Sequence, residues 1–148
     1  MRYIILVFCL CLIACRPGSW TAQKSFSQNS WLYSDSLVIE PIIEDTTSMH
    51  STEIEISLEE NYPFRNLFIR EEITTPSDSS FVRIQEFQLM NEEGIWTQKP
   101  DILGNVKFTL PLLSGIKFRE KGKWKISCKQ YMRTDSLEGI KEISWQLK

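Results

Sequence analysis

Apolar and polar residues alternate along most of the chain beyond residue 31, and this two-residue period predicts β-strands. Successive side chains of a strand point to opposite faces, so the apolar set of each segment would face a core. Within 52–58, for example, Ile54, Ile56 and Leu58 share one face. The segments, clearest ones first, are 52–58, 105–112, 123–133 and 142–147, then 36–43, 66–74 and 81–90.

Turn-forming residues separate these segments, and no long stretch carries the 3.6-residue period of a helix. Examples are Asp45-Thr46-Thr47, Pro76-Ser77-Asp78 and Lys121-Gly122. The arrangement predicts an all-β fold, an antiparallel β-sandwich of about seven to nine strands over residues 31–148. Pro111 has no backbone N–H, so its strand is expected at a sheet edge or with a bulge.

The N-terminus has a different pattern, one positive charge followed by the apolar run IILVFCLCLIA. This pattern is typical of a signal peptide and is too short to cross a bilayer as a helix. Leu12-Ile13-Ala14-Cys15 fits a bacterial lipobox, with a small residue before the cleavage point and a lipid-accepting thiol after it. The alternatives are a plain secretory signal and a buried apolar strand. We predict a signal peptide over 1–14, acylation of Cys15 by diacylglycerol and palmitate-type chains, and a flexible tether over 15–30.

The composition adds a constraint on the cysteines. The chain has 148 residues, 42% hydrophobic and 24% charged, which suits one globular domain. Cleavage would remove Cys9 and Cys11 and acylation would block Cys15, so no intramolecular disulfide is expected. By the alternation Cys128 lies on the apolar face, which predicts a buried, unreactive thiol. The single histidine, His50, argues against His-based metal or catalytic sites.

Charge is unevenly distributed. Residues 51–101 carry 4 basic and 11 acidic residues, whereas 102–148 carry 10 and 4. The basic excess falls mostly on one parity, at Lys117, Arg119, Lys121, Lys123, Lys125 and Lys129, and the acidic counterpart is Glu53, Glu55 and Glu59. Three interpretations remain: solvated outer faces, pairing of the two stripes across neighbouring strands, or a basic surface for an acidic partner or lipid head groups.

No motif of a known catalytic or cofactor site occurs, such as HExxH, GxGxxG, Walker A or GxSxG. Adjacent acidic pairs such as Glu71-Glu72 would point to opposite faces of a strand and form no carboxylate pair. Asp101 could bind calcium, although a loop-capping role fits better. We predict no catalytic residue, metal or cofactor, and a protein that is not an enzyme. An exported chain of net charge −2 is also not expected to bind nucleic acid.

Aromatic residues cluster with polar ones at 62–67, 94–96, 118–124 and 130–140. Exposed aromatics beside Arg are typical of binding hot spots, although core packing and turns would also explain these clusters. The candidate partner-binding residues are Tyr62, Phe64, Arg65, Trp96, Tyr131 and Arg133.

These clusters, in this order behind a lipobox, resemble the gliding motility lipoprotein GldH family of Bacteroidota. The matching elements are Cys15, Asp35-Ser36-Leu37, Tyr62-Pro63-Phe64-Arg65-Asn66-Leu67, Gly94-Ile95-Trp96, Gly122-Lys123-Trp124, Gln130-Tyr131-Met132-Arg133 and Leu137-Glu138-Gly139-Ile140. After Trp96 the chain departs from the expected Gly-rich loop, with Thr97-Gln98-Lys99-Pro100-Asp101 in its place.

The resemblance implies a lipid-anchored, non-enzymatic component of the gliding apparatus, which is linked to type IX secretion. Its expected partners are the membrane, through Cys15, and other envelope proteins. Arg16-Pro17-Gly18-Ser19 lacks the acidic residues of many surface-exported lipoproteins of this phylum, which favours the outer membrane with the domain facing the periplasm. The alternatives are a glycan- or lipid-binding sandwich, with Trp96 and Tyr62 exposed on one concave patch, and a lipid-anchored hydrolase.

Overall fold

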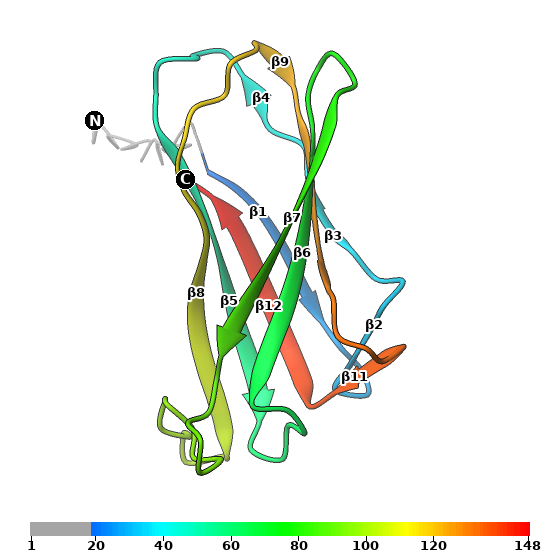
Figure 1. Ribbon diagram of the computed structural model, residues 1–148, viewed down its shortest axis with the longest axis vertical. Coiled ribbons are helices and arrows are strands. Elements are labelled where there is room, and N and C mark those ends of the chain that lie inside the picture. The colour runs from blue at the N-terminus through cyan, green and yellow to red at the C-terminus, as the bar shows by residue number, and fades with distance from the viewer. Residues whose placement is uncertain (1–18) are drawn as a thin grey trace, which may run out of the picture.

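The protein is an antiparallel β-sandwich, as the alternation predicts (Figure 1). The computed structural model describes residues 19–148, which form strands and loops without a helix. No helix that could span a membrane therefore occurs in this part of the chain. Within these residues the twelve strands, in chain order, are β1 (Trp20–Ser25), β2 (Ser30–Leu32), β3 (Leu37–Ile39), β4 (Ile42–Ile43), β5 (His50–Glu59), β6 (Asn66–Thr74), β7 (Ser80–Gln88), β8 (Asn105–Ile116), β9 (Gly122–Lys123), β10 (Lys125–Gln130), β11 (Ser136–Glu138) and β12 (Ile140–Leu147).

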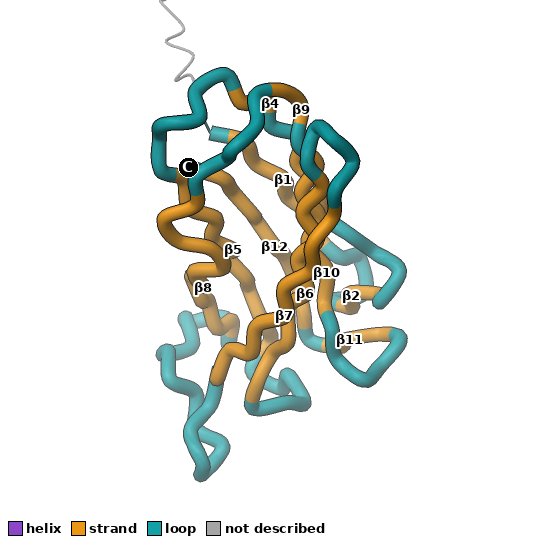
Figure 2. The backbone as a smooth tube through the Cα atoms, turned by 45° about the horizontal axis from the view of Figure 1, so that its top comes forward, coloured by secondary structure: helices purple, strands orange, loops and turns teal. Residues whose placement is uncertain are grey.

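Two four-stranded sheets form the layers. The first sheet has the order β1-β12-β5-β8, and the second sheet has the order β3-β10-β6-β7. Two short pairs, β2 with β11 and β4 with β9, lie near opposite ends of the sandwich, where the loops also gather (Figure 2). Every strand pair is antiparallel, because hairpins and longer crossovers return the chain in the opposite direction each time.

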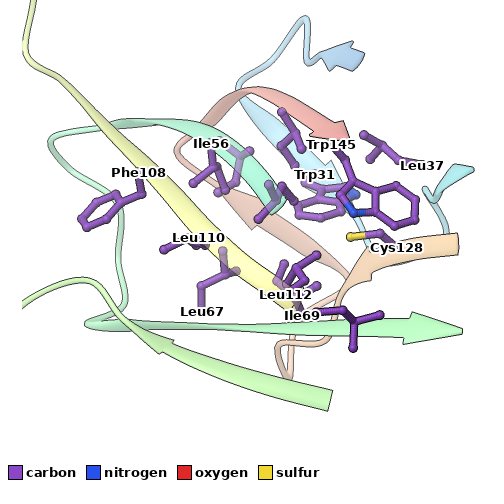
Figure 3. Packing of buried hydrophobic residues seen from close by; sticks show 14 of the residues in the cluster. Trp31, Leu37, Ile56, Leu67, Ile69, Phe108, Leu110, Leu112, Cys128 and Trp145 are labelled. Atoms are coloured by element: carbon purple, nitrogen blue, oxygen red, sulfur yellow. The ribbon is translucent and has the colours of Figure 1, made fainter. Parts of the chain in front are cut away.

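The core lies between the inner faces of the two sheets (Figure 3). Trp31 and Trp145 are fully buried there, and Cys128 lies beside them. Cys128 is a buried free thiol, as predicted, and desolvation together with the nearby Glu71 carboxyl raises its pKa. The thiol acts as a small apolar group in the packing.

Pro111 lies on β8, which is an edge strand of the first sheet. The register shifts at the same place, because Thr52 pairs with Leu113 whereas Glu53 pairs with Pro111. Leu112 is the extra residue of this bulge. The edge position and the bulge, either of which the missing N–H predicts, are therefore both present. As a result, no neighbouring carbonyl needs a hydrogen bond from the proline nitrogen.

The predicted tether is wrong from residue 20 onward. Trp20–Ser25 forms β1, which pairs with β12 over six residues, and Ser30–Leu32 forms β2, which pairs with β11. Without β1, the backbone N–H and C=O groups along one edge of β12 would have no partner. β1 pairs with these groups, although most of its side chains are polar. The predicted signal peptide over 1–14 and the predicted acylation of Cys15 lie outside the described residues.

The charged stripes do not pair with each other. Glu53, Glu55 and Glu59 lie on β5 in the first sheet, whereas Lys125 and Lys129 lie on β10 in the second sheet, so the stripes occupy different layers. Glu53 instead binds Lys148 at 2.5 Å and Gln146 at 2.6 Å on its own sheet. The interpretation of cross-strand pairing is therefore wrong, and only the last part of the basic stripe follows a strand face.

Candidate functional site

An aromatic groove on the outer face of the second sheet gathers three of the predicted binding residues. Its volume is about 650 Å³. The lining residues come from β6, β7 and the loops after β2, β5 and β10, and are Tyr33, Phe64, Phe68, Ile84, Tyr131, Met132 and Arg133. All but Arg133 present apolar or aromatic surface, so the groove can bury apolar side chains of a ligand.

A buried glutamine supports the turn that forms one wall of this groove. Gln130, at the end of β10, is fully buried, and its Oε1 accepts the Met132 N–H at 2.7 Å. Its Nε2 donates to the Thr134 carbonyl at 3.1 Å. These bonds fix the turn after β10, while the Tyr131 N–H donates to the Phe68 carbonyl at 2.8 Å. Gln130 therefore holds the turn so that Tyr131 and Arg133 project outward.

Cationic groups border the aromatic wall. The Tyr33 and Tyr131 rings lie 6.3 Å apart, and Lys129 Nζ lies 4.1 Å from the centre of the Tyr33 ring. Arg133 is exposed at the groove, and neither it nor Lys129 forms an ion pair within residues 19–148. The site therefore combines apolar surface with available positive charge, which suits a ligand that carries both aromatic and carboxylate groups.

Three of the six candidate residues, Phe64, Tyr131 and Arg133, meet in the groove. Arg65 points elsewhere, because its Nη1 donates to the Glu92 carbonyl at 2.7 Å and so ties the β5–β6 turn to the loop after β7. The main-chain carbonyl of Arg65 also accepts from Leu89 and Met90. Arg65 is therefore placed to order a loop, although its side chain stays exposed.

Tyr62 and Trp96 do not form an exposed patch, which corrects the glycan-platform alternative. Tyr62 is 3% exposed, its hydroxyl donates to the Asn66 carbonyl at 2.9 Å, and burial raises its pKa. Trp96 is half-buried, with its ring 6.3 Å from Tyr62 and 6.0 Å from Phe108. The two rings pack with each other and with the core, since the 91–97 loop folds back over the end of the sandwich.

Sequence reasoning missed four groove residues: Tyr33, Phe68, Ile84 and Met132. Phe68 and Ile84 occupy outward positions of β6 and β7, and an apolar residue at such a position is a signal that the alternation itself contains. Tyr33 and Met132 carry no such signal, because loops from distant parts of the chain place them.

The comparisons with known proteins decide the family. The family model for the GldH lipoprotein matches residues 19–146. The chain belongs to this family. It is 27% identical over 157 residues to the gliding motility lipoprotein GldH of Flavobacterium johnsoniae, with 98% of this chain and 94% of that protein covered. It is 28% identical over 153 residues to a GldH homolog of Christiangramia forsetii, with 97% and 93% covered.

The match confirms the predicted family and identifies a gliding-motility lipoprotein, lipid-anchored at the cell envelope. The family match includes β1, in agreement with its place in the first sheet.

Two of the sequence blocks that resemble the GldH family, Tyr62-Pro63-Phe64 and Leu137-Glu138-Gly139-Ile140, pack against each other. Gly139, between β11 and β12, accepts the Glu59 N–H on its carbonyl at 2.8 Å and has φ +81°. A Cβ at this position would lie 3.1 Å from the Tyr62 Cα. The Tyr62-Pro63-Phe64 block therefore needs glycine opposite it, and both blocks together fix the turn that carries Phe64 to the groove.

Asp101 caps its loop, as its sequence context favours. Its Oδ1 accepts from the backbone N–H of Asn105 at 2.9 Å and of Leu103 at 2.8 Å. These hydrogen bonds, chiefly that from Asn105, lower the pKa of the carboxyl. Among residues 19–148 no cluster of three or more His, Cys, Asp or Glu side chains could hold a metal ion.

Proposed function

We propose that this chain is a non-enzymatic, protein-docking subunit of the gliding machinery, linked to type IX secretion. In this proposal a lipid on Cys15 holds the protein at the outer membrane, with the domain facing the periplasm. The aromatic groove with its cationic border is the observation that carries the docking role. The occupant is an exposed segment of another envelope protein that brings apolar or aromatic side chains together with carboxylates.

The position of the groove supports a protein partner over the membrane lipid. β1 begins at the end of the sandwich where β4 and β9 also lie, so the described chain starts at that end (Figure 1). The loops that carry Tyr33, Phe64 and Tyr131 lie toward the opposite end, near β2 and β11. An anchor at the β1 end leaves the groove directed away from the lipid surface and accessible to other envelope proteins.

Photocrosslinking from the groove tests this function. A photoreactive residue at Tyr131, in the full lipoprotein in its native envelope, should crosslink to a specific envelope protein. The matched control is Thr109, which is exposed on the outer face of the first sheet and should give no specific product. Adducts to glycan or lipid from Tyr131, with no protein adduct, would contradict docking and favour the alternative of a glycan- or lipid-binding module.

The double substitution Tyr131→Ala with Arg133→Glu supplies the functional measurement. Both side chains are exposed, so the fold should persist while the partner recovered with the lipoprotein falls roughly tenfold or more. Colony spreading and release of secreted proteins should fall with it. Normal recovery of the partner with normal spreading would refute a docking role for the groove.

A further inference from the structure

The β7 strand is a long, open edge of the second sheet. It spans nine residues, pairs with β6 on one side, and has no strand on its other side within residues 19–148. The other edges of the two sheets offer less to a partner strand, because β3 has three residues, β1 has six, and β8 carries Pro111 and a bulge. Unpaired backbone groups on an edge such as β7 are a ready template for another strand.

Both faces of β7 are accessible. Phe81, Arg83 and Gln85 pair with the inward-facing residues of β6, so they lie on the inner side of the second sheet. Phe81 is nevertheless 51% exposed and Arg83 is exposed, so the start of β7 is uncovered on this side, whereas Phe87 near its end packs against the core. An added strand would therefore find space on both sides of the sheet.

Gln85 has an unmet acceptor at this edge. Its Oε1 is buried and accepts no hydrogen bond from any described residue. A buried carbonyl oxygen without a donor is unfavourable, so turning of the half-buried Gln85 side chain toward a donor from outside the monomer would stabilise this position. Arg83, two residues earlier on the same face, carries free guanidinium donors and forms no ion pair within residues 19–148.

We propose that the β7 edge pairs antiparallel with β7 of a second copy of this chain, so that two second sheets become one continuous sheet. The two-fold axis passes through Ile84. This register pairs the whole strand, Ser80 with Gln88 at each end, and it places Phe81 opposite Phe87 and Arg83 opposite Gln85. The Arg83 guanidinium of each copy then donates to Gln85 Oε1 of the other.

The sequence of β7 favours this register over its neighbours. With the axis at Ile84, Val82 faces Glu86 and Ile84 faces Ile84, so no like charges oppose each other. An axis at Arg83 would place two guanidinium groups directly opposite each other. An axis at Gln85 would leave Arg83 opposite Phe87 and Gln85 opposite itself. The self-complementary register is thus the one that uses the full strand and satisfies the buried Gln85 oxygen.

Cysteine crosslinking of the full-length chain in its native membrane tests the contact. Directly opposed residues of an antiparallel pair have Cα atoms about 5 Å apart, within disulfide range. Under mild oxidation Ile84→Cys should therefore give a reducible species of twice the mass. The matched control is Val82→Cys, whose two copies lie about 13 Å apart in this register and should stay uncrosslinked. Adding Glu86→Cys to Val82→Cys should restore the crosslink.

A substitution that opposes pairing completes the test. Ile84→Lys places two ammonium groups on the axis and should reduce the Val82→Cys/Glu86→Cys crosslink at least tenfold, while the half-exposed position keeps the fold intact. The native chain gives the background, because Cys128 is buried. Absence of crosslinks above background for both Ile84→Cys and the double cysteine variant would overturn the dimer, and a strong Val82→Cys crosslink would overturn its register.

Discussion

Gly139 and Tyr62 show at the residue scale how a short motif can be structural. Gly139 has φ +81° and contacts the backbone of Tyr62, so the position excludes a side chain for two separate reasons. Gly94 also has positive φ, at +78°, but nothing lies within 4 Å of the Cβ that alanine would add. A comparison of alanine substitutions at Gly139 and Gly94 therefore separates the destabilisation caused by the backbone conformation from that caused by the close contact with Tyr62.

Gly139→Ala should lower the free energy of unfolding by about 3 kcal/mol, because strain at positive φ adds to overpacking against Tyr62. Gly94→Ala should lower it by about 1 kcal/mol, from backbone strain alone. Urea denaturation of both variants and the native chain measures the difference. Equal losses in the two variants would show that the contact with Tyr62 contributes nothing.

Glu71 is the second informative residue, since it is a carboxyl inside the sandwich. It is 1% exposed on β6, and Thr52 Oγ1 donates to its Oε1 at 3.2 Å. Its Oε2 accepts no hydrogen bond from the described residues. Burial raises the pKa of Glu71 to about 7, against the smaller lowering effects of Thr52 and Arg83.

The raised pKa of Glu71 predicts that stability falls as pH rises from about 4.5 to about 7. The folded chain holds this proton more tightly than the unfolded chain, so the free energy of unfolding declines across this window by up to about 3 kcal/mol. Denaturant titrations at pH 5 and pH 8 measure the decline. Glu71→Gln should flatten it, and an unchanged slope in that variant would assign the effect to another group.

At the element scale, β1 determines where the folded domain begins. It covers the free edge of β12 over six pairs, and the side chains of Trp20 and Ala22 pack against the core. The polar residues between them gave this segment the appearance of a linker. Strand formation here depends on the edge that β12 offers rather than on the propensity of the segment.

Removal of β1 should therefore destabilise the domain. A chain that begins at Phe26 should lose roughly 2–4 kcal/mol of unfolding free energy relative to one that begins at Ser19, because it exposes apolar surface and the β12 edge. Thermal and urea unfolding of the two chains provide the measurement. Equal unfolding midpoints in the two chains would show that β1 contributes nothing to the stability of the domain.

At the scale of the whole molecule, β1 brings the domain close to its predicted anchor. Trp20 is the first residue of β1, so only five peptide units separate it from Cys15. A fully extended segment of this length spans at most about 18 Å. The anchored domain would thus stand near the membrane surface, with the groove toward its far end, where other envelope proteins can reach it.

Acylation of Cys15 predicts a fractionation result. Cys15→Ala should move the protein from the membrane fraction to the soluble fraction, since the lipid chains supply the attachment. Cys128→Ala is the matched control and should remain with membranes, because Cys128 lies in the core. A Cys15→Ala protein that still sediments with membranes would show that the lipobox assignment is wrong.

The sequence by itself determined the strand class, the inward faces of β5, β8, β10 and β12, the edge or bulge at Pro111 and the burial of Cys128. These properties follow from a two-residue period and from the chemistry of single residues, which act locally. The family resemblance was also readable, since it rests on ordered short motifs. The same local rules placed Tyr131 and Arg133 on the outward face of their segment but could not show that they meet Phe64 in one groove.

Only the tertiary structure decided which distant segments lie together. It placed β1 in a sheet, Tyr62 and Trp96 against the core, and the two charged stripes on different layers. It also assembled the groove from residues as far apart in the chain as Tyr33 and Arg133. The physical reason is that pairing of strands and packing of sheets are non-local, so the exposure of a side chain depends on what crosses over it.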